Sequence, residues 1–373
     1  MHKITNHSTF FTLLQAGLWE NDVLSGIEET ADFNDVLRLA GEQSVMGLIA
    51  AGIEHCHNIK IPQDIVFNVL GNTLQIEQRS RKMNEFIALH YERLINEGIK
   101  TLLVKGQGIA QCYERPLWRA SGDVDLLLDY DNYEKAKLSI TEVASNVMEE
   151  DPDMKHWDAN VGDFEIELHG TLRSLLLPRM DKVIDSVQDD TFINNHVRFW
   201  NVNGVNVTLP SIDNDIIFIF THIVKHLFHE GVGLRQICDW CRLLWSNKSE
   251  INESLLKKRL TDAGIMTEWI VFANLAVNYL GASKDVIPLY ECKPKWERRA
   301  NRLMGFILET GNFGHNRDNS YFNNTGFIKQ KIISLWRHTC DSITLFRVFP
   351  KDSIIVWNRI IKTGVKAVVK GGK

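Results

Sequence analysis

The 373-residue sequence has no long apolar run, and neither sign of charge dominates it. Its longest apolar runs, such as residues 216–220, are far shorter than the ~20 residues that a membrane-spanning helix needs. The formal net charge of −5 gives no global sign of nucleic-acid binding. The first residues are polar and lack the apolar segment of a secretory signal. These absences predict a cytoplasmic protein without a membrane span.

Cysteine is also scarce, and its six copies do not have the spacing of a small disulfide-bonded scaffold. We therefore expect reduced thiols. Cys238 and Cys241 form a Cys-x-x-Cys pair inside an apolar helical stretch, without a second pair that would complete a zinc site. A redox or metal role is one interpretation of this pair, and buried packing thiols are the favoured one.

The spacing of apolar residues divides the chain into three regions, 1–98, 99–210 and 211–373. The first region reads as helices, including a long one over residues 63–96 that Gly98 ends. The second mixes strands near residues 99–105, 123–128 and 164–169 with a helix over 133–147, and Asn203-Gly204 predicts a hairpin turn. The third region is helical, with Ser211 as a helix cap. The expected class is α+β, mostly helical overall.

Two acidic residues stand on the strand predicted over residues 123–128. Asp123 and Asp125 lie two apart, so both side chains share one face of the strand, while Val124, Leu126 and Leu128 point to the other face and into a core. Adjacent carboxylates repel unless a cation neutralises them, and hard divalent ions prefer oxygen ligands. Glu167 alternates with apolar residues on another predicted strand, where it shares a face with His169. We predict that Asp123, Asp125 and Glu167 are catalytic and hold Mg²⁺ (or Mn²⁺).

A metal-bound triphosphate would also need cationic and amide donors. The turn that follows the first predicted strand contains a lysine and two glycines, which allow the backbone to approach phosphate closely. An arginine and a glycine precede the acidic pair. Each of these motifs is common when it occurs alone, and their combination is more specific. The predicted nucleotide and phosphate contacts are Lys105, Gly106, Gln107, Gly108, Arg119 and Gly122.

Two histidines in the third region are spaced four residues apart on a predicted helix. His222 and His226 therefore share one helix face, which fits a metal site, a packed face or the lining of a nucleotide cleft. His169 is a further candidate for lining this cleft. Arg235 and Asp239 have the same spacing, and the simplest interpretation is an ion pair within one helix.

The order of these motifs resembles that of a known family. Residues 103–113 and 119–128, followed by Glu165-Ile166-Glu167-Leu168-His169, resemble the uncharacterised nucleotidyltransferase family of the DNA polymerase β-like superfamily. The family pattern runs Lys-Gly, a short helix, Arg, Gly-Asp-Ile-Asp-Leu-Leu-Val and a later Glu-x-His strand. The resemblance continues through residues 222–226 and 233–240 and, less closely, 311–314.

This resemblance implies a polymerase β-like nucleotidyltransferase core, a small mixed sheet with helices behind it, which binds an NTP such as ATP together with Mg²⁺. Asp123 and Asp125 would be the paired metal ligands, and Glu167 would complete the site and polarise the acceptor hydroxyl. The sequence departs from the wider superfamily at Lys105-Gly106-Gln107-Gly108, where that superfamily has a Gly-Ser pair whose hydroxyl assists the phosphates.

The implied reaction is transfer of an NMP from an NTP to an acceptor, with release of pyrophosphate. The acceptor stays open between a protein, an RNA, a sugar and another small molecule, because no recognisable motif marks the residues that would bind it. Two alternatives are kept. One is a catalytically silent nucleotide- or partner-binding regulatory protein, for example a toxin–antitoxin component, and the other is kinase-like phosphotransfer.

Overall fold

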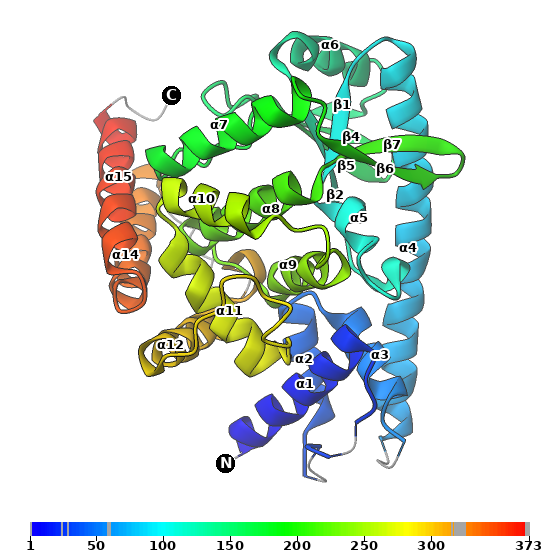
Figure 1. Cartoon of the computed structure of the whole chain (residues 1–373), viewed down its shortest axis with the longest axis vertical. Coiled ribbons are helices and arrows are strands. Elements are labelled where there is room, and N and C mark those ends of the chain that lie inside the picture. The colour runs from blue at the N-terminus through cyan, green and yellow to red at the C-terminus, as the bar shows by residue number, and fades with distance from the viewer. Residues whose placement is uncertain are drawn as a thin grey trace.

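The computed structural model describes residues 2–23, 25–27, 30–57, 61–314, 316 and 326–369. It is mostly helical, with one five-stranded mixed sheet and a separate hairpin (Figure 1). The α+β class expected from the sequence is therefore confirmed.

The first region forms four helices: α1 (His2–Trp19), α2 (Phe33–Glu42), α3 (Met46–Glu54) and α4 (Gln63–Asn96). The side chain of Asp32 caps α2 by accepting a hydrogen bond from the Asn34 N–H, which would otherwise lack a partner in the first turn. The 34-residue α4 has the limits that apolar spacing predicts. It runs along one side of the molecule from the N-terminal helices to the sheet (Figure 1).

The sheet has the strand order β1-β2-β5-β4-β3. Its strands are β1 (Thr101–Val104), β2 (Asp123–Leu128), β3 (Asn146–Val147), β4 (His156–Val161) and β5 (Phe164–His169). Only β2 and β5 pair in parallel, so they bring together segments far apart in the sequence, and the other neighbours are antiparallel. Between β1 and β2 lie the short helix α5 (Gly106–Ala110) and the 3₁₀ turn η1 (Pro116–Trp118).

The helix expected over residues 133–147 differs from the helix observed. α6 (Tyr130–Thr141) begins earlier, because the Asp129 side chain accepts a hydrogen bond from the Asn132 N–H and caps it. It ends before β3, which occupies the last two residues of the predicted helix. The strand β4 and the helix α7 (Pro178–Phe192) were not predicted. The hairpin of β6 (Val197–Val202) and β7 (Val205–Pro210) turns at Asn203-Gly204 as expected.

The third region is helical as predicted wherever it is described. It contains α8 (Ile212–His229), α9 (Leu234–Ser246), α10 (Glu253–Ala263), α11 (Met266–Leu280), α12 (Pro294–Thr310), the 3₁₀ turn η2 (Asn312–Gly314), α14 (Phe327–Phe346) and α15 (Pro350–Val369). Ser211 stands at the start of α8 but makes no side-chain cap, contrary to the expectation. Its backbone carbonyl accepts from the Asn214 and Asp215 N–H groups.

Two hydrophobic cores hold these elements. One lies between the sheet and α4, α6 and the hairpin, and it takes Val124, Leu126 and Leu128 from β2. The larger one joins the N-terminal and C-terminal helices and takes Leu127 from the other face of β2. Cys238 and Cys241 are fully buried in this core, which confirms the packing interpretation. The division into three regions stays a prediction, although its limits fall between elements.

The position of the sheet decides where a site can form. Figure 1 shows α8 beside the sheet and α9 next to α8, and residues of both helices line one cavity together with Asp123 and Asp125 of β2. Among the described residues, no helix is both long and apolar enough to cross a bilayer.

Candidate functional site

The predicted acidic residues meet on one face of the sheet. In the parallel pairing of β2 with β5, Asp125 lies opposite Glu167 and Asp123 lies opposite Glu165. Side chains two apart on a strand share a face, so Asp123, Asp125 and Glu167 point to the same side. Asp125 is buried, and the other two are partly exposed.

Lys105 supplies a positive charge beside these acids. Its Nζ lies 2.6 Å from Asp125 Oδ1, and the two side chains are 15% and 4% exposed. Burial acts to lower the pKa of Lys105, but the charges of Asp125 and Glu167 outweigh it, so that the pKa is raised and the lysine stays charged. Lys105 also has a φ of 58°, a conformation that non-glycine residues seldom adopt, so the turn holds its side chain at some conformational cost.

Two histidines from neighbouring strands complete this cluster. The β4–β5 register places His156 directly opposite His169, and their rings stack with centroids 4.7 Å apart. His169 Nε2 lies 2.8 Å from Asp125 Oδ1, and His156 Nε2 lies 3.3 Å from Glu167 Oε2 and 3.0 Å from Asp158 Oδ1. Hydrogen bonds with these two acids raise the pKa of His156 to about 9.

The three predicted metal ligands differ in their ease of ionisation. Burial, together with the charges of Asp125 and Glu167, raises the pKa of Asp123 to about 6. Burial also acts to raise the pKa of Asp125, but the charge of Lys105 and the hydrogen bond with His169 outweigh burial, so this pKa is lowered. Burial also opposes ionisation of Glu167, whose pKa is nevertheless lowered by hydrogen bonds with the two histidines. Asp123 is therefore the acid that gains most from an added cation.

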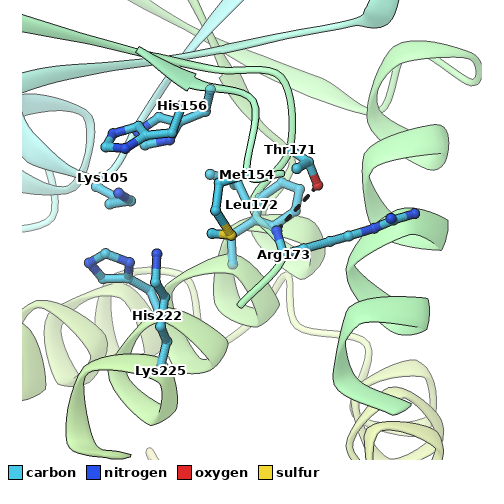
Figure 2. A pocket seen from close by; sticks show the side chains of 10 residues that line it. Lys105, Met154, His156, Thr171, Leu172, Arg173, His222 and Lys225 are labelled. Carbon is cyan, nitrogen blue, oxygen red and sulfur yellow. Dashed lines mark hydrogen bonds between the residues drawn. The ribbon is translucent and has the colours of Figure 1, made fainter. Parts of the chain in front are cut away.

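A cavity of about 1220 Å³ opens in front of the acids. Asp123, Asp125 and Glu167 line one wall, and α8 and α9 form the opposite wall. His222 and Lys225 point from α8 toward Lys105 and His156 across a narrow recess of this space (Figure 2). The volume is large enough for a nucleotide with room beside it.

Two cations on the helical wall were not predicted as ligand contacts. Lys225 has no hydrogen-bond or ion-pair partner among the described residues, and burial followed by the charge of Lys105 lowers its pKa. Arg235 donates from Nη1 to the Ala120 carbonyl at 2.9 Å, but its buried Nε has no partner in the described part of the chain. Leaving donors of such partly buried cations without partners is costly, so both positions are suited to an anionic ligand.

His222 and His226 both line the cavity from α8. Burial lowers the pKa of each ring, and for His222 the charge of Lys105 adds to this effect. They are therefore neutral near pH 7. Their ring centroids lie 4.2 Å apart, and His226 Nδ1 lies 3.3 Å from Glu230 Oε2.

Arg119 lines the cavity but has a strong partner already. Its guanidinium makes two hydrogen bonds with the Asp239 carboxylate, at 3.1 and 2.7 Å, and the Tyr113 hydroxyl donates to the same carboxylate at 2.8 Å. The expected ion pair between Arg235 and Asp239 is therefore wrong. A buried two-point contact with Arg119 satisfies Asp239 better than a single pair within α9 would.

The remaining predicted phosphate contacts occupy different surroundings. Gly106 lines the cavity, with a φ of +42° that favours glycine. Gln107 is buried and turns toward α4, where its Nε2 donates to the Asn84 side chain at 3.1 Å. A Cβ on Gly108 would lie 2.9 Å from the side chain of Leu209, so this glycine permits close packing of α5 on the hairpin. Gly122 is exposed, and its carbonyl accepts a hydrogen bond from Arg79. The helix α5 has only five residues, which limits its dipole.

The donor set of this site fits a divalent cation. Asp123, Asp125 and Glu167 present carboxylate oxygens from adjacent strands, and Lys105 is the positive charge that offsets them here. His156 joins the cluster although it is not among the residues predicted from the sequence. The alternation of His156, Asp158 and Asn160 with apolar residues along β4 was the signal that could have found it.

Comparison with known proteins gives one match. The family model described as uncharacterised nucleotidyltransferase matches residues 29–281, which is more than half of the chain. No curated protein matches the chain. No solved structure matches it either.

Proposed function

The chain belongs to the uncharacterised nucleotidyltransferase family, and from this we propose that it transfers an NMP from an NTP to an acceptor hydroxyl or phosphate, releasing pyrophosphate. The observation that carries the proposal is the parallel register of β2 and β5, which sets Asp125 opposite Glu167 on the cavity wall. We further propose that the five-stranded sheet is a polymerase β-like core, that Mg²⁺ or Mn²⁺ is the cofactor, and that the protein is cytoplasmic.

Asp123, Asp125 and Glu167 would hold the metal. A divalent ion in such a site neutralises charge on the transferred phosphoryl group and activates the attacking oxygen. Lys105 neutralises Asp125, and if a metal took over that charge, the ammonium would be free to meet a phosphate. Glu167 stays ionised, because its pKa is lowered, and can orient the acceptor hydroxyl by accepting its hydrogen bond. The acceptor oxygen bonds to the α-phosphorus while the bond between that phosphorus and the oxygen bridging to the β-phosphorus breaks. The proton of an acceptor hydroxyl passes to solvent, and pyrophosphate leaves.

The helical wall supplies the charge for the leaving group. Lys225 and Arg235 face the cavity from α8 and α9 with donors that no described residue uses. A triphosphate lying between the two walls would meet carboxylate-bound metal on one side and these cations on the other. Arg119 acts through Asp239 in this arrangement, since its donors are already engaged.

The experiment follows the two ends of the triphosphate. The protein is incubated with Mg²⁺, NTPs labelled at the α- or γ-phosphate, and a pool of small-molecule, RNA and protein acceptors. We expect the γ-label in pyrophosphate and the α-label on an acceptor. Asp123→Asn should abolish both. Asp163→Asn is the matched control, because this acid lies in the β4–β5 turn with its side chain 76% exposed.

The same assay separates the alternatives. Release of a nucleoside diphosphate would indicate kinase-like transfer and refute the proposal. Binding of NTP without any turnover across the acceptor pool would favour a silent nucleotide-binding protein. Full turnover in Asp123→Asn, with its fold intact, would contradict the role given to the acidic pair.

A further inference from the structure

The imidazole nitrogens beside Glu167 form a donor set that the aspartate pair does not explain. We propose that His156, Glu167 and His169 hold a second divalent ion of the Co²⁺ or Zn²⁺ type, next to the carboxylate site. This inference deepens the proposed function and rests on it for the neighbouring ion at Asp123 and Asp125. It is tested by binding, so that its failure can be told apart from failure of the proposed reaction.

The backbone already brings the three residues together. His156 and His169 are direct partners in the β4–β5 ladder, and Glu167 is two residues before His169, so all three side chains share one face. One ligand atom from each residue lies within 4.8 Å of the others. No rearrangement of the strands is therefore needed to assemble the site.

The distances agree with those around a small ion. Ligands bonded at 2.0–2.1 Å in tetrahedral geometry are about 3.3 Å from one another. Glu167 Oε2 lies 3.3 Å from His156 Nε2 and 3.4 Å from His169 Nε2. Both nitrogens that face this oxygen are thus at coordination spacing from it.

The donor type selects the class of ion. Mg²⁺ favours oxygen ligands, whereas imidazole suits Zn²⁺, Co²⁺ and other transition ions. Two histidines and a glutamate, with a fourth position open to the cavity, form a set that such ions commonly occupy. All three residues line the cavity, so an ion can reach them.

The site also adjoins the aspartates closely enough for a two-ion arrangement. Glu167 belongs to both donor sets, and Asp125 Oδ1 lies 2.8 Å from His169 Nε2. Two-metal transfer sites hold their ions about 3.5–4 Å apart, usually with a carboxylate in common. Glu167 and Asp125 are placed to serve as such shared ligands, with an oxygen-rich side at Asp123 and a nitrogen-rich side at His156.

The test is a Co²⁺ titration of the whole protein in the presence of excess Mg²⁺, followed by visible absorption and by equilibrium dialysis. We expect Co²⁺ to bind although Mg²⁺ occupies the oxygen site. His156→Gln and His169→Gln should each weaken Co²⁺ binding by at least about tenfold, as even outer-shell changes do at metal sites. His229→Gln is the matched control in the same cavity, with its side chain 51% exposed, and it should bind Co²⁺ like the wild type.

A second measurement needs no variant. Co²⁺ bound to the wild type in excess Mg²⁺ should show nitrogen coupling from imidazole in pulsed EPR spectra. Oxygen-only coordination, displacement of all Co²⁺ by Mg²⁺, or unchanged Co²⁺ binding in folded His156→Gln and His169→Gln would each overturn the inference. Histidine-dependent Co²⁺ binding without nucleotide turnover would leave it standing and refute the proposed function. Turnover without such Co²⁺ binding would overturn the inference and leave the proposed function standing.

Discussion

Replacing Lys105 with methionine removes the cation beside the acidic residues while keeping most of the side-chain volume. Lys105 Nζ lies 2.6 Å from Asp125 Oδ1, and both side chains are largely buried. Removing one partner of a buried ion pair destabilises a protein by about 3–5 kcal/mol, because the other charge stays buried. His169 keeps a hydrogen bond with Asp125, so we expect the lower end, about 3 kcal/mol, in the metal-free protein.

Mg²⁺ should reduce this loss. An ion at 100 times its Kd stabilises the folded state by about 2.7 kcal/mol. In Lys105→Met the gain should be larger than in the wild type, because the lysine no longer competes for Asp125. Urea unfolding followed by circular dichroism, with EDTA or with Mg²⁺, measures both the stability lost in Lys105→Met and the stability gained from Mg²⁺.

The control for this experiment is Lys258→Met. Lys258 pairs with Asp262 on the surface of α10, where its side chain is 71% exposed, and such pairs contribute about 0.3–0.5 kcal/mol. The reasoning would be refuted if Lys105→Met unfolded like the wild type in EDTA. It would also be refuted if Mg²⁺ stabilised both proteins equally.

Four further substitutions have defined outcomes. Lys225→Met should weaken Mg²⁺–NTP binding by roughly 10- to 100-fold in calorimetry, since a hydrogen bond to a charged group contributes about 1.5–3 kcal/mol, while the nucleotide-free protein melts no lower. Burial, followed by the charge of Asp352, raises the pKa of Glu268 to about 8. The free energy of folding that its protonated form contributes is therefore fully present below about pH 4.5, and it is lost as the pH rises through about 8. Glu268→Gln should therefore flatten the pH dependence of the free energy of unfolding by a few kcal/mol. Gly52→Ala should lower the melting temperature, because the new Cβ would lie 2.0 Å from a carbonyl oxygen of α1. Gly71→Ala on α4 should instead stabilise the protein by about 0.5–1 kcal/mol, because its Cβ would point into open space.

The part of the site that could be predicted depends on local periodicity. Side chains alternate along every strand, so the shared face of Asp123 and Asp125, and that of Glu167 and His169, followed from spacing alone. The limits of α4 followed for the same reason, because 34 residues at helical spacing leave little ambiguity.

The remaining features depend on pairings between distant segments. Nothing in β2 or β5 alone indicates that they pair in parallel with Asp125 opposite Glu167. Local spacing even misled at α9, where it predicted a pair within the helix, whereas Asp239 bonds Arg119 from 120 residues away. Lys225 lies three residues after His222 and so shares its helix face, but only the placement of α8 across the cavity from the acids turns that face toward them.

The most direct test of the central claim is a crystal structure with Mn²⁺ and a non-hydrolysable NTP analogue. The account predicts an anomalous peak coordinated by Asp123, Asp125 and Glu167, with the α-phosphate at the ion and the outer phosphates near Lys225 and Arg235. A nucleotide bound elsewhere, or an ion that contacts neither aspartate, would contradict it.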